Sequence, residues 1–214
     1  QGNQELRYRA HVAFSTAFDL VRDLEKVQNR RKALIFVSNG YDFDPFPQGR
    51  LQRDAMYGYN QTGMDPRDPA AVTNRQGQQF ADADLARELA DLTRAANRAN
   101  TTVYTIDPRG LVGGPEMDDE VDMSEWGNHV RKTQDSLRVL AEETGGMAVV
   151  NQNDFVKSLK RIDAETSDYY VLGYYSSNPD PTRKRRQIEV KVTRQNVSVW
   201  ARKGYALKTP DERK

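Results

Sequence analysis

Two short apolar runs, each preceded by a segment with helical spacing of apolar residues, organise the chain. The first run covers residues 33 to 38 and ends in Ser38-Asn39-Gly40. The second covers residues 102 to 106 and ends in Asp107-Pro108-Arg109-Gly110. An uninterrupted apolar run is typical of a strand buried on both faces of a parallel sheet, and the turn residues that follow favour strand over buried helix. Apolar residues every three or four positions predict helices over residues 5–28 and 80–100.

A strand, a helix and a second strand in this order predict two parallel neighbouring strands joined by a right-handed crossover. The loops after residues 38 and 107 then lie at the same edge of the sheet, where open α/β sheets bind ligands. We call this edge the loop edge. The alternative is that Ser-Asn-Gly only turns the chain and the aspartates are solvated. The candidate binding residues of the loop edge are Ser38, Asn39, Asp42, Asp44, Asp107 and Arg109.

The rest of the pattern completes an α/β fold with two parts. Long loops are expected over 45–79 and over 110–132; the second is acidic but lacks the spacing of an EF-hand loop. A third helix over 133–144 ends at two glycines, a short strand covers 147–150, and Asn151 or Asn153 caps a fourth helix. We predict an α/β domain over 1–168. Residues 169–214 are expected to pack on it as a strand over 169–175 and an antiparallel ribbon over 187–207.

Composition narrows the function classes. The 214 residues include no cysteine, which excludes disulfides, thiolate zinc sites and cysteine nucleophiles. A formal net charge of +1 provides no global field for nucleic acid, and no apolar run approaches the roughly 20 residues of a membrane span. The two histidines, His11 and His129, belong to no catalytic spacing. Because the chain begins at Gln1, we expect a processed or truncated start.

Five blocks of the chain resemble a known family. In order they are KALIFVSNGYD, ANRANTTVYTIDPRG, SLRVLAEETGGMAVV, DYYVLGYYS and VWARKGYAL. Together they resemble the von Willebrand factor type A-like domains of the bacterial "VWFA-related" group, from about residue 5 to residue 207. The resemblance implies a Rossmann-like sheet with helices on both faces. In better known relatives it also implies a metal-ion-dependent adhesion site that binds an acidic residue of a partner protein.

Most of that metal site has no counterpart here. The family begins it with Asp-x-Ser-x-Ser after the first strand, and this string is absent; Asp122-Met-Ser124-Glu-Trp126 stops one residue short of it. Only Asn39 matches a position, where many members have aspartate, and a neutral amide oxygen is a weaker Mg²⁺ ligand than a carboxylate. We therefore expect a degenerate site with no cofactor and at most weak Mg²⁺ or Ca²⁺ binding at Asn39.

The same resemblance implies that the family's first strands are missing from this chain. The strand at 33–38 then has an unpaired edge, which is costly to bury. We expect a preceding segment, a partner chain or a neighbouring copy to complete the sheet. A strand that is exposed and unpaired in this chain alone would count against that hypothesis.

The sequence predicts a non-catalytic, extracytoplasmic module, periplasmic or secreted, that binds a protein partner through the loop edge. It predicts neither nucleic-acid binding nor a membrane span. One alternative is a Mg²⁺-dependent hydrolase or phosphate-handling enzyme that uses Asp42, Asp44 and Asp107, although no glycine-rich phosphate loop is present. Another is a structural scaffold that docks a protein along its β ribbon.

Overall fold

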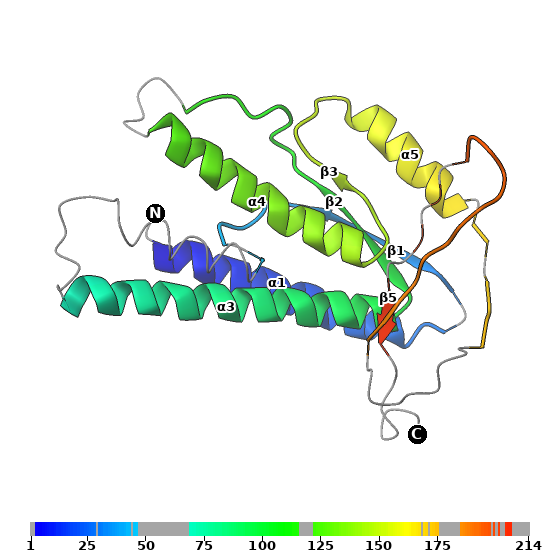
Figure 1. Ribbon diagram of the computed structural model, residues 1–214, viewed down its shortest axis with the longest axis horizontal. Helices are drawn as coiled ribbons and strands as arrows, with labels where there is room; N and C mark the ends of the chain where they lie inside the picture. Colours follow the sequence, from blue (N-terminus) through cyan, green and yellow to red (C-terminus); the bar gives the residue numbers. More distant parts are fainter. Residues whose placement is uncertain are drawn as a thin grey trace.

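The computed structural model describes residues 3–28, 30–43, 45–46, 69–115, 122–167, 169–170, 172–175, 185–197, 199, 201 and 204–206. It is a mixed α/β fold, as predicted (Figure 1). The helices are α1 (Asn3–Glu25), α3 (Pro69–Arg98), α4 (Met123–Glu143) and α5 (Phe155–Ser167). The strands are β1 (Lys32–Val37), β2 (Thr101–Ile106), β3 (Ala148–Val149), β4 (Arg185–Gln187) and β5 (Gly204–Ala206).

The main sheet has the order β1-β2-β3, and both strand pairs are parallel. The register of β1 and β2 runs from Lys32 opposite Thr101 to Val37 opposite Ile106. The prediction that the two apolar runs are parallel neighbours is therefore confirmed. Both strands end at the same edge of the sheet, which places the loops after them side by side.

Helices pack against both faces of this sheet. On one face α1 and α3 run side by side, and Phe14, Leu92 and Leu140 pack with Val103 of β2 in the larger hydrophobic cluster (Figure 1). On the other face Ile162 of α5 packs with Tyr104, Ile106 and Val149 in a smaller cluster. Alternation of side chains along β2 explains why its neighbours Val103 and Tyr104 belong to different clusters.

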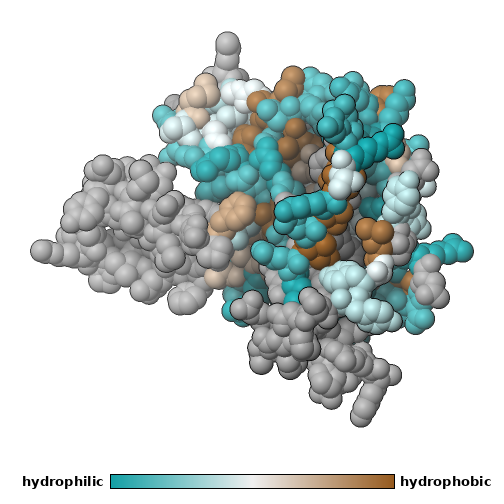
Figure 2. Space-filling model, turned by 45° about the vertical axis from the view of Figure 1, so that its right-hand side comes forward, coloured by the Kyte–Doolittle hydropathy of each residue, from teal (hydrophilic) through white to brown (hydrophobic). Residues whose placement is uncertain are grey.

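The two long strands differ in burial, and the prediction for the first was wrong. Every residue of β2 is buried, because helices cover both of its faces. In β1 partly buried and exposed positions alternate: Leu34 and Phe36 are partly buried against the helices, while Ile35 and Val37 are 47% and 61% exposed. Among the described residues, helices therefore cover only one face of the apolar strand β1. Figure 2 shows apolar side chains that reach the surface among hydrophilic ones.

The outer edge of β1 pairs with no strand among the described residues. The chain forms its sheet without the first strands that the family resemblance implies are missing. This counts against the hypothesis that another segment must complete the sheet. The apolar side chains on the uncovered face count for it, because monomeric proteins seldom leave an apolar strand edge open. Completion of the sheet therefore stays a prediction.

Two helices begin earlier than predicted. Residues 69–79 were expected in a loop but belong to α3, and residues 123–132 were expected in the acidic loop but belong to α4. Asp122 caps α4, since its Oδ1 accepts a hydrogen bond of 2.7 Å from Ser124 N. Hydrogen bonds from Ser124 hold the pKa of Asp122 below its usual range. The string that partly resembles a metal motif is therefore a helix cap.

The predicted end of α4 is confirmed, whereas the prediction that Asn151 or Asn153 caps α5 was wrong. Gly145, with φ of 78°, ends α4 as predicted, and Gly146 N donates to Ala141 O at 2.8 Å. At α5 the cap is Asp154, whose Oδ1 accepts from Lys157 N at 2.9 Å. Asn153 instead accepts a hydrogen bond from Leu111 N at 2.8 Å. That bond joins the loop after β2 to the segment before α5.

The predicted C-terminal strands are mostly not confirmed. Residues 169–170 and 172–175 lie in no strand, and neither do residues 188–197. What remains is an antiparallel pair of three-residue strands, β4 and β5. Alternating apolar residues favour a strand only when a partner covers the apolar face, and Val192 and Val197 are 49% and 46% exposed.

Gly40 offers a test of how the loop after β1 meets α4. Its φ is 79°, and a Cβ added there would lie 1.9 Å from the backbone oxygen of Thr133. We expect Gly40→Ala to lower the free energy of unfolding by about 2 kcal/mol or more, because strain and overlap add. Gly127 in α4 has open space around it, so Gly127→Ala should raise stability by about 0.5–1 kcal/mol. Urea unfolding checks both, and equal effects would contradict the predicted contact.

Candidate functional site

An ion pair between a buried carboxylate and a partly exposed guanidinium lies at the centre of the loop edge. Asp107, the first residue after β2, is fully buried, and it would be costly there as an unpaired charge. Arg109 neutralises it with two side-chain contacts: Nε donates to Oδ1 at 2.9 Å and Nη2 donates to Oδ2 at 2.8 Å. The backbone N of Arg109 also donates to Oδ1 at 3.1 Å. The carboxylate is thus held from within the chain by a two-pronged contact.

The same guanidinium joins three elements. Nη2 of Arg109 donates to the backbone oxygen of Asn39 at 2.8 Å and to Thr133 Oγ1 in α4 at 3.0 Å. Thr133 is itself buried, and its hydroxyl donates to Val130 O at 2.8 Å. The structure therefore brings Asn39, Asp107 and Arg109 together, as the parallel arrangement of the two strands predicts.

The turn after β1 is fixed by short contacts. Ser38 N continues the ladder to Ile106 O at 3.0 Å, and Ser38 Oγ accepts from Gly40 N at 3.1 Å. Tyr41 N donates to Ser136 Oγ of α4 at 3.1 Å. Burial raises the pKa of Tyr41. Ser38 thus shapes the turn, and its hydroxyl is occupied by the backbone of Gly40.

Asp42 belongs to a second charged cluster on α4. His129 Nδ1 lies 3.1 Å from Asp42 Oδ2, and Lys132 Nζ lies 3.5 Å from Oδ1. The hydrogen bond to His129 and the nearby charge of Lys132 hold the pKa of Asp42 below its usual range, although partial burial acts against them. Trp126 lies beside His129, with 6.0 Å between ring centroids, and its Nε1 donates to Gly113 O at 2.7 Å.

Sequence reasoning missed this contribution of α4. It treated residues 110–132 as a loop and gave Trp126 and His129 no chemical role. The available signal was helical spacing: His129, Lys132 and Thr133 lie three and four residues apart, on one side of a helix. Because α4 begins at Met123, that side meets the loops after β1 and β2.

The structure does not bring the three aspartates of the enzyme hypothesis together as free ligands. Asp107 is bound to Arg109, Asp42 is bound to His129 and Lys132, and Asp44 lies outside the described residues. Within the described part of the chain, no group of three or more acidic or histidine side chains is placed to hold a metal ion. Weak metal binding at Asn39 remains a prediction.

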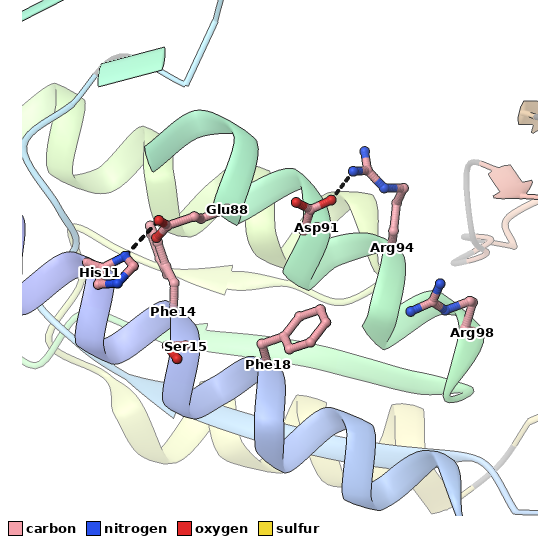
Figure 3. A pocket seen from close by; sticks show the side chains of 8 residues that line it. All are labelled: His11, Phe14, Ser15, Phe18, Glu88, Asp91, Arg94 and Arg98. Atoms are coloured by element: carbon pink, nitrogen blue, oxygen red, sulfur yellow. Dashed lines mark hydrogen bonds and ion pairs between the residues drawn. The ribbon is translucent and has the colours of Figure 1, made fainter. Parts of the chain in front are cut away.

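A groove of about 330 Å³ lies elsewhere, between α1 and α3 (Figure 3). Phe14 and Phe18 of α1 line it, and a contact of 2.7 Å between His11 Nδ1 and Glu88 Oε1 joins the two helices at one end. Asp91 and Arg94 of α3 form an ion pair at its border. The candidate residues at the loop edge are not among the described residues that line this groove.

Among the described residues of the loop edge, Asp42 and Asp107 are both paired with basic side chains of the chain itself. Leu111 in the loop after β2 and Met123 at the start of α4 are 60% and 67% exposed. In the part of the chain that the structure describes, no helix is both long and apolar enough to cross a membrane.

Comparisons with known proteins give no relative: no family model, no curated protein and no solved structure matches the chain.

We predict that substitutions of Asp107 and Arg109 have strongly coupled effects on the free energy of unfolding. Arg109→Met leaves a buried carboxylate without its cation, so we expect a loss of about 3–5 kcal/mol in the free energy of unfolding. Adding Asp107→Asn to that variant removes the buried charge and should recover part of the loss. Arg138→Met, which removes a partly exposed helix pair with Asp135, should cost less than about 1 kcal/mol. Similar urea midpoints for Arg109→Met and Arg138→Met would contradict this reading.

Asp42 predicts a pH dependence with a definite sign. Its pKa is lower in the folded chain than the usual value of about 3.9, so its stabilising effect is complete above that value. The effect is lost as the pH falls through the lowered pKa. The stability difference between the native chain and Asp42→Asn should therefore shrink on acidification, as followed by unfolding at several pH values. His129→Gln should weaken this dependence; a pH-independent difference would refute the prediction.

Proposed function

We propose that this chain is a non-catalytic protein-interaction module of the von Willebrand A-like kind, with a Rossmann-like sheet and an extracytoplasmic location. The observation that carries the proposal is the open side of β1. Ile35 and Val37 are about half exposed, whereas their neighbours in register, Tyr104 and Ile106, are buried under α5. An apolar strand face that ends without cover is a surface on which another polypeptide can gain stability.

The backbone of β1 supports the same proposal. Lys32 N donates to Asn100 O at 3.0 Å and Ser38 N donates to Ile106 O at 3.0 Å, so even-numbered residues of β1 direct their amides toward β2. Amides alternate in direction along a strand, which turns those of Ala33, Ile35 and Val37 toward the open edge. A strand from a preceding segment, a partner chain or a neighbouring copy can pair with them by β-augmentation.

The loop edge adjoins this open strand. Val37 is the last residue of β1, and the turn at Ser38 and Asn39 follows it directly. A partner that pairs with β1 therefore comes next to Asn39, whose position Arg109 fixes. We infer that the loop edge selects the partner through Asn39, Asp42 and the exposed Leu111, while β1 provides the pairing surface.

The enzyme alternative gains no support from the site. Its central residue, Asp107, is buried and bound by Arg109, so Mg²⁺ would have to displace an internal cation from a closed position. The scaffold alternative, docking along the C-terminal ribbon, draws on a strand pair that is only three residues long.

Photo-crosslinking tests the proposed surface. Benzoylphenylalanine placed at Val37 should capture one defined polypeptide from the extracytoplasmic fraction of the source cells. The same group at Tyr8, which is 68% exposed on α1, is the matched control and should not capture it. Ile35→Lys with Val37→Lys should lose that polypeptide in pull-down, because two desolvated charges oppose pairing.

Two results would contradict the proposal. One is identical capture at Val37 and Tyr8, which indicates nonspecific contact. The other is fast hydrogen exchange of the amides of Ile35 and Val37 that persists when the captured polypeptide is added in excess.

A further inference from the structure

One asparagine of the loop edge stands in a sequence that favours the loss of its side-chain amide. Asn39 is followed by Gly40, and this is the only Asn-Gly pair in the chain. Glycine has no side chain to shield its backbone nitrogen, so this nitrogen can reach the amide carbon of the preceding asparagine and close a succinimide ring. The sequence therefore distinguishes Asn39 from the other asparagines.

The structure leaves the side chain of Asn39 open to this reaction. Asn39 is exposed, and its side chain makes no hydrogen bond with the described part of the chain. The contact that holds the residue goes to its backbone oxygen, from Arg109 Nη2 at 2.8 Å. The amide carbon Cγ is thus accessible to water and can turn toward the nitrogen of Gly40.

Arg109 favours the reactive form of that nitrogen. The nitrogen of Gly40 attacks after it has lost its proton, and the negative charge then spreads over the peptide group onto the oxygen of Asn39. A guanidinium that donates to this oxygen stabilises the charge as it develops. Because Asp107 already neutralises Arg109, the effect comes from this hydrogen bond and not from a net positive field.

Ser38 acts in the opposite direction. Its Oγ accepts a hydrogen bond from Gly40 N at 3.1 Å, and this bond must break before the nitrogen can bond to the side chain of Asn39. Gly40 is also closely packed, since a Cβ added to it would lie 1.9 Å from the backbone oxygen of Thr133. The turn therefore slows the reaction, and the hydroxyl of Ser38 is the restraint that can be removed without changing this packing.

We propose that Asn39 is a site of slow deamidation in the folded chain, at a rate set by the hydroxyl of Ser38. Hydroxide takes the proton of Gly40 N, the nitrogen bonds to Cγ of Asn39, and the bond from Cγ to Nδ2 breaks as ammonia leaves. Water then opens the succinimide at either of its carbonyl groups and gives aspartate or isoaspartate. Asparagine and water thus become a carboxylate and ammonium, and no oxidant or cofactor is needed.

The product carries a new negative charge at the loop edge. The carboxylate appears at an exposed residue whose backbone is held by Arg109, in the same loop as Asp42. In the proposed function Asn39 helps to select the partner, so deamidation changes the selecting surface as the chain ages. This consequence rests on the proposed function, whereas the deamidation itself does not.

Peptide mapping by mass spectrometry tests the proposal on the full chain, incubated at one mildly alkaline pH. We expect aspartate and isoaspartate to appear at Asn39 before any other asparagine. Ser38→Ala should convert roughly twofold to tenfold faster, because one hydrogen bond fewer restrains Gly40, and the amide of Gly40 should exchange faster with deuterium. Ser38→Thr keeps the hydroxyl and is the matched control, so it should convert at the native rate.

A further comparison separates release of the turn from unfolding. Hydrogen exchange at Tyr104, which is buried in β2, should stay as slow in Ser38→Ala as in the native chain. Faster conversion with faster exchange at Tyr104 would indicate unfolding and overturn the role of Ser38, as would equal rates in Ser38→Ala and Ser38→Thr. A native chain in which Asn39 stays intact while other asparagines convert would overturn the site. None of these measurements needs a partner, so a failure of the proposed function leaves their outcome unchanged.

Discussion

The contact on which the loop edge depends is the ion pair of the buried Asp107 with Arg109. A carboxylate at the end of β2 is fully buried there, and one guanidinium neutralises it while also holding Asn39 and Thr133. Removing either partner leaves the other charge or the turn unsupported. Because the pair joins the loops after β1 and β2 to α4, it fixes the surface on which the proposed recognition takes place. It also occupies the carboxylate that metal-dependent chemistry would need.

The sheet is covered unequally, and the proposed function follows from that inequality. Helices close both faces of β2, while β1 keeps an open edge and two half-exposed apolar side chains. The outer edge of β1 pairs with no strand among the described residues. This open edge is the place where we propose that another polypeptide pairs.

Sequence patterns were most informative for elements whose apolar residues are regularly spaced within one segment. Helical spacing identified α1 and the second half of α3, and the two apolar runs identified β1 and β2. The same patterns placed helix starts too late: residues 69–79 and 123–132 are polar on average, so their spacing carried little hydrophobic signal. The group formed by Asp42, His129 and Lys132 was missed for that reason.

The sequence by itself determined the α/β class, the parallel pairing of β1 with β2 and the position of Asn39 and Asp107 at the same edge of the sheet, because the order of strand and helix leaves one favourable handedness. Only the tertiary structure decided that Arg109 neutralises Asp107, that β1 is covered on one face, and that residues 169–170 and 172–175 lie exposed. An apolar run shows that burial of its side chains is favourable, but it does not show which element covers them. Which residues find partners depends on the packing of distant segments, which no local pattern encodes.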